Sequence, residues 1–353
     1  MNRIIDKDFC LSSYMAFRYI YKDNYDFFGR MQHQTFKGVP KEERVKVRTA
    51  NEIDFFIKKQ IDDLYRKHTK IGILLSGGMD SAVLATYLKP GSNAYTFRTN
   101  LSNTFDADIE RSEKYCRMLG LNHIYIDIDF DDYKKYTPIV MKSKSAPVHS
   151  IEPQLYKAAI EARKQGDELI IEGDGADYIF GGVDKLLSKD WRYGDFVERY
   201  TYLNPTFVLN NPVDISDFFE KYRLADDMID FWGIITNECL YESLSSYHNA
   251  FVAAGMPYSD LYAVFEMADK IDLHRIRRGE SKYLIRELYS KKYPDFEVPE
   301  KIPMPRPVDV IFGDWKGPTR AEFRRDINMQ SLTGNQKWQL WCAEQFLYLF
   351  DDR

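Results

Sequence analysis

The stretch Ile71-Gly-Ile-Leu-Leu-Ser-Gly-Gly-Met-Asp-Ser81, followed by Ala82-Val-Leu-Ala-Thr-Tyr-Leu88, decides the fold of this chain. The apolar residues 71–75 predict a buried strand, and 82–88 predict the helix that follows it. Glycines between the two let a ligand approach the backbone closely, and free amide groups at the start of the helix point toward an anion. The segment therefore predicts a phosphate-binding loop. It differs from the Gly-Lys-Ser/Thr nucleotide loop because it contains no lysine.

An acid inside this loop needs a physical reason. Two like unit charges about 4 Å apart repel by roughly 4 kcal/mol at an effective dielectric constant near 20. A cation between Asp80 and a phosphate removes that repulsion, and Mg²⁺ prefers carboxylate and phosphate oxygens. We therefore expect Asp80 to be a magnesium ligand beside a nucleotide. Taken alone, the Gly-Gly pair also fits a simple tight turn.

The stretch resembles the pyrophosphate loop of the N-type ATP pyrophosphatases. That superfamily includes asparagine synthetase, GMP synthetase, NAD synthetase, argininosuccinate synthetase and several tRNA-modifying enzymes. The resemblance implies ATP and Mg²⁺ as cofactors. It also implies cleavage of ATP between the α and β phosphates, so that AMP is transferred to a substrate oxygen and pyrophosphate leaves.

Composition narrows the class of protein. The chain has 353 residues, 44% of them hydrophobic and 29% charged, which is typical of a soluble globular protein with one large domain. A net charge of −5 and a pI near 5.8 argue against a nucleic-acid partner. No apolar run reaches the length of a membrane span and residues 1–30 lack a signal-peptide pattern, so we expect a cytoplasmic protein with no membrane partner. Scattered cysteines predict free thiols at Cys10, Cys116, Cys239 and Cys342.

Strand and helix patterns alternate after the loop. Strands are predicted at 94–97, 123–127 and 168–172, and helices at 106–119, 131–143 and 152–165. This alternation predicts an α/β fold with a doubly wound parallel sheet, which the resemblance specifies as adenine nucleotide α-hydrolase-like, with an added helical layer. Ligands of such sheets bind beyond the carboxyl ends of the strands, where Ser76, Thr99 and residues 172–177 are expected.

Three regions follow from these patterns. Residues 1–50 form an N-terminal connecting segment with a helix at 11–21. Residues 51–185 form the nucleotide-binding α/β core. Residues 186–353 are predicted to be mostly helical and packed on that core, with an irregular proline-rich stretch at 294–318 and one more helix over the last thirty-odd residues.

A second acidic loop follows the fourth predicted strand. It reads Glu172-Gly-Asp-Gly-Ala-Asp177, with Phe180-Gly-Gly182 just after it. An acidic surface turn is one interpretation. Its place at the same sheet edge as the first loop favours a metal–phosphate site, in which Asp80 and Asp177 face each other across the triphosphate and hold magnesium.

These residues resemble the second loop of asparagine synthetase and of relatives such as β-lactam synthetase, Ser-Gly-Glu-Gly-Ala/Ser-Asp-Glu-x-Phe-Gly-Gly. Two further segments are similar to that family, Ala16–Ile20 and Val252–Asp260. The resemblance spans nearly the whole chain and is strongest from 71 to 182.

The resemblance assigns roles to individual residues. It implies an acid or base role beside the acyl-adenylate for Asp174, which stands where the family has glutamate. It places the adenosine of ATP against Leu75, Thr99, Glu172 and Gly173. It places the phosphates against Ser76, Gly77, Gly78, Asp80 and Ser81.

Departures from the family pattern change the expected substrates. Asn2 follows Met1 where the family's glutaminase half has its catalytic cysteine, so we expect free ammonia, a separate glutaminase partner or an amine substrate as the nitrogen donor. Val308 stands where asparagine synthetase has a lysine, two residues after an arginine. Together with Ala253 and Gly255, which replace family Glu and Arg, this disfavours aspartate as the acceptor. Candidate replacements for the lysine are Arg306 and Lys282, which we take as catalytic, and Lys301 and Lys316; each also fits a surface cation.

The favoured function is an AMP- and pyrophosphate-forming amide synthetase that acts on a small-molecule carboxylate. A sugar uronic acid of surface-polysaccharide synthesis is the preferred acceptor, and peptide natural-product synthesis is the other setting. The alternatives are a tRNA-modifying or sulfur-transfer pyrophosphatase and a degenerate, non-catalytic synthetase subunit. The acidic balance argues against the first, and the intact loop at 76–81 with Asp177 argues against the second.

Overall fold

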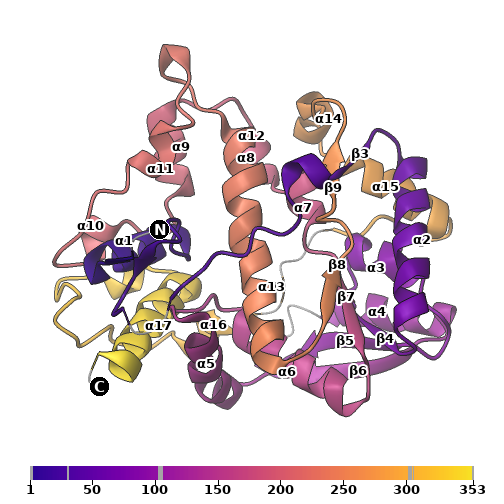
Figure 1. The fold of residues 1–353 in the computed structure, drawn as a ribbon, viewed down its shortest axis with the longest axis horizontal. Helices are drawn as coiled ribbons and strands as arrows, with labels where there is room; N and C mark the ends of the chain where they lie inside the picture. Colours follow the sequence, from indigo (N-terminus) through magenta and orange to yellow (C-terminus); the bar gives the residue numbers. More distant parts are fainter. Residues whose placement is uncertain (1–2, 30–31, 102–105, 301–303, 305, 352–353) are drawn as a thin grey trace.

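A computed structural model of the protein describes residues 3–29, 32–101, 106–300, 304 and 306–351. Its centre is a five-stranded, fully parallel sheet with the order β6-β5-β4-β7-β8 (Figure 1). The strands are β4 (Ile71–Leu74), β5 (Asn93–Arg98), β6 (Asn122–Asp127), β7 (Leu169–Glu172) and β8 (Tyr258–Asp260). The predicted α/β class and its first four strands are confirmed.

The order of the strands reverses between β4 and β7. The chain leaves β4 toward β5 and β6 on one side, and then returns to place β7 on the other side. Ile71 pairs with Leu169 and Ile73 with Ile171, so the two strands run side by side and their carboxyl ends meet. The loops that follow β4 and β7 therefore lie next to each other at the switch point of the sheet, where ligands bind in folds of this kind.

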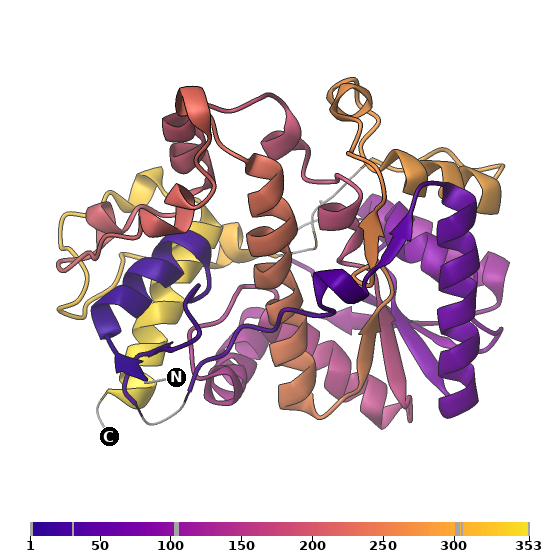
Figure 2. The ribbon, with the colours of Figure 1, turned by 45° about the horizontal axis from the view of Figure 1, so that its top comes forward.

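Helices cover both faces of the sheet. One face, which includes Ile71 and Ile73, packs against α2 (Ala50–Lys67), α3 (Met79–Ala85), α4 (Asp106–Leu119) and α15 (Tyr283–Lys292). The other face, which includes Leu74 and Ile170, packs against α5 (Phe130–Lys144), α6 (Glu152–Lys164) and α13 (Leu240–Ala254). Alternate side chains of a strand point to opposite faces, which is why both sides of β4 are apolar. Figures 1 and 2 show α2 and α13 on opposite sides of the sheet.

The structure shifts several predicted boundaries. Helix α3 begins at Met79 rather than 82, with Gly78 at its N-cap position, and this places Asp80 and Ser81 in its first turn. Asp6 caps α1 (Lys7–Phe17), which therefore begins before residue 11, and Arg18 is the C-cap residue after its last turn. The last long helix, α17 (Gly334–Phe350), starts after Thr333 because that residue forms a capping box with Gln336.

Strand β8 was missed by the sequence patterns. Its three residues, Tyr-Ser-Asp, contain no apolar run or alternation that a pattern could detect. The division of the chain at residue 185 stays a prediction, and the fifth strand of the sheet comes from beyond that point.

Shorter elements complete the fold. Parallel pairs join β1 (Ile4–Ile5) to β2 (Tyr25–Asp26) and β3 (Val45–Val47) to β9 (Phe265–Met267). The short helices are α7 (Ala176–Ile179), α8 (Asp184–Leu187), α9 (Tyr193–Tyr200), α10 (Pro205–Val208), α11 (Asp217–Glu220), α12 (Phe231–Ile234), α14 (Leu273–Arg277) and α16 (Val308–Ile311), with a π-helical turn at Ile235–Cys239 and 3₁₀ turns at Lys41–Glu43, Ala225–Asp227 and Met329–Ser331. The four cysteines are free thiols. In the described ranges no helix is both long and apolar enough to cross a membrane.

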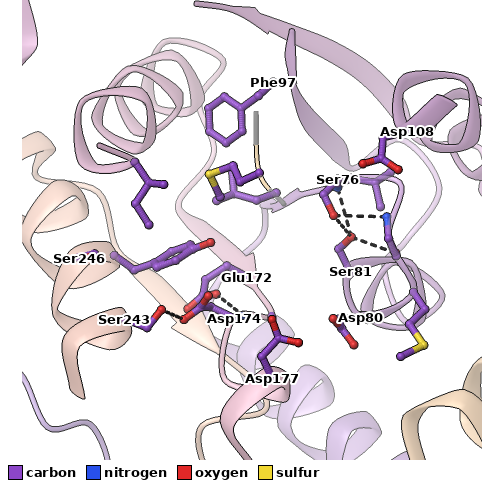
Figure 3. Close-up of a pocket in the computed structure, with 18 of the residues that line it drawn as sticks. Ser76, Asp80, Ser81, Phe97, Asp108, Glu172, Asp174, Asp177, Ser243 and Ser246 are labelled. Atoms are coloured by element: carbon purple, nitrogen blue, oxygen red, sulfur yellow. Dashed lines mark hydrogen bonds between the residues drawn. The ribbon is translucent and has the colours of Figure 1, made fainter. Parts of the chain in front are cut away.

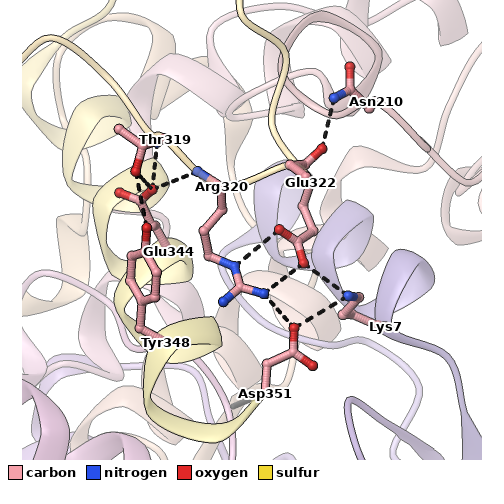
Figure 4. Close-up of polar contacts among 9 residues, drawn as sticks. Lys7, Asn210, Thr319, Arg320, Glu322, Glu344, Tyr348 and Asp351 are labelled. Carbon is pink, nitrogen blue, oxygen red and sulfur yellow. Dashed lines mark hydrogen bonds and ion pairs between the residues drawn. The ribbon is translucent and has the colours of Figure 1, made fainter.

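A charged network ties the two ends of the described chain together (Figure 4). Lys7 Nζ lies 2.9 Å from Glu322 Oε1, and Arg320 Nη2 lies 3.0 Å from the same oxygen. Arg320 also pairs with Asp351, just beyond α17. The start of helix α1 is thereby joined to the C-terminal region.

Candidate active site

A cavity of about 430 Å³ opens at the carboxyl edge of β4, β5 and β7. This volume lies within the usual range for small-molecule sites, about 300–1,000 Å³. Both predicted loops line it, together with side chains of α13 (Figure 3). Arg18 at the end of α1 and the segment before α15 complete the lining. The structure thus brings the two acidic loops into one site, as their positions on the sheet predicted.

Two serines fix the shape of the first loop. Ser76 Oγ and Ser81 Oγ are 3.1 Å apart, and the backbone N–H of Ser76 donates to Ser81 Oγ at 3.2 Å. Gly78 N–H donates to Ser76 Oγ at 3.3 Å. Gly77 has φ +76°, and a Cβ there would lie 2.2 Å from the carbonyl oxygen of Asp108. Only glycine fits at that position, so the loop approaches α4 closely and leaves its hydroxyls in the cavity.

The second loop is held by an acid from β8. Gly175 N–H donates to Asp260 Oδ2 at 2.7 Å, while Tyr262 N–H and Ala263 N–H donate to Asp260 Oδ1 at 2.9 and 3.1 Å. Asp174 N–H donates to Glu172 Oε2 at 2.7 Å. Asp260 lies at the end of a segment that resembles the family, but its supporting role could not be found without the pairing of β8 beside β7.

Burial raises the pKa values of the carboxyl groups in and around this loop. It raises the pKa of Glu172 well above its ordinary value, and neighbouring Asp260 and Asp174 add to that effect. Burial also raises the pKa of Asp260 to about 6, against the three amide donors that stabilise its charge. The pKa of Asp174 is raised well above its ordinary range by burial, although a hydrogen bond from Ser243 opposes the shift. Asp174 is therefore a stronger base than a solvated carboxylate.

Lys282 joins the two loops. Its Nζ lies 2.5 Å from Asp80 Oδ2 and 2.7 Å from Asp177 Oδ1, and the residue is only 3% exposed. Burial alone would lower the pKa of Lys282, but Asp177 and Asp80 raise it above its ordinary value, so the side chain is an ammonium ion. Figure 3 shows Asp80 and Asp177 facing each other from the two loops.

The same pair of carboxylates fits a magnesium ion. Mg²⁺ in nucleotide sites is typically held by one or two carboxylates, with substrate phosphates completing its shell. Asp80 and Asp177 already converge on one cation, the Lys282 ammonium. Within the described residues no cluster of three or more His, Cys, Asp or Glu side chains offers a metal site, so phosphate oxygens would have to complete the shell here.

The remaining predicted residues divide between the cavity and its surroundings. Leu75, Gly173 and Arg306 line the cavity, as do Ser76, Gly78, Asp80 and Ser81. Thr99 and Gly77 are outside its lining: Thr99 Oγ1 accepts from Leu101 N–H at 3.2 Å, and Thr96 and Phe97 of β5 face the cavity instead.

The substitutes for the family lysine also separate. Val308, at the position of that lysine, is fully buried in the hydrophobic core. Lys316 is exposed and outside the lining, and Lys301 lies outside the described residues. Lys282 is the candidate that contacts both loops.

Sequence patterns missed the side chains on the α1 and α13 side of the cavity. Arg18 Nη2 lies 3.2 Å from Glu242 Oε2, and Arg18 Nη1 lies 3.1 Å from His149 Nε2. Ser243, next to Glu242 on α13, donates to Asp174. These residues come from segments more than 90 positions apart, and each sits in an ordinary helical or loop pattern. No local signal could have joined them.

The fold and the paired loops are those of the ATP-using carbon–nitrogen ligases of the pyrophosphate-loop type. A family model described as asparagine synthase matches residues 56–249, which is more than half of the chain. The chain belongs to the asparagine synthase family. No curated protein matches it.

Two solved structures are among those similar to the chain. One is an NH3-dependent NAD synthetase from Campylobacter jejuni, with 22% identity and a TM-score of 0.26; the match covers 37% of this chain and 58% of that one. The other is an NMN synthetase from Francisella tularensis, with 11% identity and a TM-score of 0.29, covering 73% of this chain and 100% of that one. The chain thus spans little more than half the length of the first, and neither likeness bears on the substrate.

Proposed function

We propose that this protein is an ATP-dependent amide synthetase that forms AMP and pyrophosphate. The observation that carries the proposal is the convergence of Asp80 and Asp177, from two loops of the asparagine synthase family, on one cation at the edge of the cavity. A site built this way suits a triphosphate, whose charge needs both a cation and hydroxyl donors.

In the first step an oxygen of the acceptor carboxylate attacks the α-phosphorus of ATP. The bond from that phosphorus to the bridging oxygen of pyrophosphate breaks, which leaves an acyl-adenylate. Ser76 and Ser81 donate hydroxyls to the phosphates, and Lys282 offers its ammonium to the leaving pyrophosphate. Magnesium held by Asp80 and Asp177 would supply further charge compensation for the phosphate oxygens.

In the second step ammonia or an amine attacks the acyl carbon. The carbon–oxygen bond to AMP breaks, an amide forms, and the nitrogen loses a proton. Asp174 is the group placed to accept that proton, since burial raises its pKa and Ser243 holds it by a hydrogen bond. A separate glutaminase is one source of the ammonia.

A sugar uronic acid is the acceptor we favour. The cavity wall formed by α1 and α13 is polar, with Arg18, Glu242, Ser243 and Ser246 among its lining residues. Such a wall suits a hydroxylated, charged molecule better than an apolar acid. Use of ATP also favours a cytoplasmic location.

ATP–pyrophosphate exchange on the purified protein tests the proposal. With magnesium and a panel of carboxylates that includes free and nucleotide-linked uronic acids, exchange should depend on the acid. Asp80→Asn should reduce exchange by about 10²–10⁴-fold, because a ligand for the phosphate-bound cation is lost. Exposed Asp195 provides the matched control, Asp195→Asn. Production of ADP and phosphate, or pyrophosphate release that requires tRNA, would refute the proposal.

A further inference from the structure

One part of the cavity carries more positive than negative charge. It is formed by Arg18, His149, Glu242 and Arg306, which we call the arginine end. Two guanidinium groups face one carboxylate there, because burial and the nearby Arg18 and Arg306 charges lower the pKa of His149 well below its ordinary value and leave it neutral. Behind it, Lys144 and Glu152 pair with each other at 2.8 Å and add no net charge.

Arg18 is held in a conformation that arginine seldom adopts. It ends α1 with φ +68°, in the left-handed region where helices usually place glycine. Of the non-glycine residues with positive φ, Arg18 and Lys282 line the cavity. Backbone strain of this kind persists where the surroundings impose it, and it concentrates at ligand sites. Lys282 pairs with Asp80 and Asp177, whereas Arg18 lies on the opposite wall with Glu242.

The Arg18 guanidinium is fixed but not saturated. Glu242 and His149 each contact one terminal nitrogen, and the ring of Tyr202 lies 4.8 Å from the guanidinium carbon. Arginine has five N–H donors in a planar fork, so several remain for a ligand. Its side chain keeps 32% exposure against 9% for Glu242, and both residues line the cavity.

Arg306 adds a second cation to the same wall. It makes no hydrogen bond or ion pair with another residue in the described part of the chain. Arg18 and Arg306 line the same cavity, and burial together with the charge of Arg18 lowers the pKa of Arg306. The single carboxylate of Glu242 cannot balance the two guanidinium charges. An anion bound between Arg18 and Arg306 would supply the missing negative charge.

We propose that the acceptor carries a second anionic group, besides the carboxylate that is activated, and that Arg18 and Arg306 bind this group. The shared chemistry is a carboxylate or a phosphate, both of which match the arginine fork. A nucleotide-linked uronic acid supplies the phosphate, and a dicarboxylic acid supplies the carboxylate.

The position of the arginine end sets the spacing within the acceptor. Glu242 and Ser243 are neighbours on α13; Glu242 holds Arg18, while Ser243 donates to Asp174 beside the reacting carbon. Through these neighbours, α13 contacts both the residue that would bind the second anion and the residue beside the reacting carbon. This inference rests on the proposed amide synthetase, since it concerns the acceptor of that reaction.

Binding and exchange measured on the same proteins test it. Titration calorimetry with a magnesium complex of a non-hydrolysable ATP analogue present would compare two matched pairs: UDP-glucuronate with glucuronate, and glutarate with its monoamide. For at least one pair, the member with the second anion should bind about 10–100-fold more tightly. Arg18→Asn, which tolerates the left-handed conformation, should remove that preference and leave the ATP analogue's affinity unchanged.

A second variant should change the preference for the doubly charged acid in the opposite direction. Glu242→Gln frees Arg18 from its internal partner and should strengthen the preference for the doubly charged acid. Arg117→Asn, at a residue whose side chain is 68% exposed on α4, should change nothing. Circular dichroism would confirm that each variant is folded.

The outcomes separate this inference from the proposed function. Equal binding within both pairs, or an unchanged preference in Arg18→Asn, overturns the inference even if exchange occurs. An Arg18-dependent preference without pyrophosphate exchange for any acid supports the anion site and overturns the amide synthetase. A preference for the phosphate pair alone supports a nucleotide-linked acceptor, and one for the dicarboxylate alone supports a simple diacid.

Discussion

Removal of the Lys282 ammonium should destabilise the protein and make it dependent on magnesium and nucleotide. The Nζ atom lies 2.5 and 2.7 Å from the carboxylates of Asp80 and Asp177, so these carboxylate oxygens are within about 5 Å of each other. Without the cation, two unit charges at about 5 Å repel by roughly 3 kcal/mol at an effective dielectric constant near 20. Breaking a buried ion pair costs about 3–5 kcal/mol in general.

Lys282→Met should therefore lower the free energy of unfolding by about 3–5 kcal/mol, measured by urea denaturation of the ligand-free protein. Magnesium with a non-hydrolysable ATP analogue should stabilise this variant more than the wild type, because the metal ion replaces the missing positive charge. Exposed Lys58 on α2 provides the control, Lys58→Met, which should stay within about 0.5 kcal/mol of the wild type.

A double-mutant cycle identifies the source of the loss. Addition of Asp80→Asn to Lys282→Met removes one of the two repelling charges and should recover part of the lost stability. If the two changes were simply additive, or if Lys282→Met were as stable as the wild type, the ammonium would not balance these carboxylates. The assignment of this place to a phosphate-bound cation would then lose its support.

Three further predictions concern the loops, the base and the network between the chain ends. Gly77→Ala should cost about 1–3 kcal/mol in urea denaturation and weaken ATP binding, because its Cβ would meet Asp108; Gly91→Ala, with φ +86° but open space around it, should cost less and leave ATP binding intact. Ser243→Ala should slow amide formation about tenfold but spare ATP–pyrophosphate exchange, because it supports Asp174 only in the second step; equal loss of both rates would contradict this order. Against the opposing effect of burial, hydrogen bonds from Arg320 and Lys7 lower the pKa of Glu322 from 4.5 to about 2. Its folded-state pKa is depressed, so its contribution, about 1–2 kcal/mol after solvent screening, is full above pH 4.5 and lost as the pH falls toward 2; Glu322→Gln should flatten the pH dependence of unfolding in that window.

The nucleotide side of the site could be predicted because its residues are local. Ser76, Asp80 and Ser81 lie within a few positions of a strand end, and so do Glu172 and Asp177. A parallel sheet then brings strand ends to one edge, which makes sequence spacing equivalent to spatial proximity. The same reasoning predicted that Thr99 lies in the site, but Thr99 does not line the cavity. It lies beyond the end of β5, and Phe97 lines the cavity instead.

The acceptor side could not be predicted for the opposite reason. Arg18 ends one helix, Glu242 lies on another, and Arg306 belongs to a proline-rich segment. Their meeting depends on how α1 and α13 pack, and on the network of Lys7, Glu322 and Arg320 that fastens α1 to the C-terminal region. Periodicity reports which face of a helix is buried but not which distant side chain it meets.

The nucleotide side of the cavity is acidic and the arginine end is basic, and this difference in charge affects where each ligand binds. Acids outnumber cations on the nucleotide side, where Asp80, Asp174 and Asp177 line the cavity together with Lys282 and Arg286. Guanidinium groups dominate the arginine end. ATP and an acidic acceptor are both anions, so each would favour the arginine end if charge alone decided. A magnesium ion bound to the triphosphate would reverse the preference of ATP, because Asp80 and Asp177 would attract that cation. The metal would thus sort the two anionic ligands between the two ends, in addition to any chemical role.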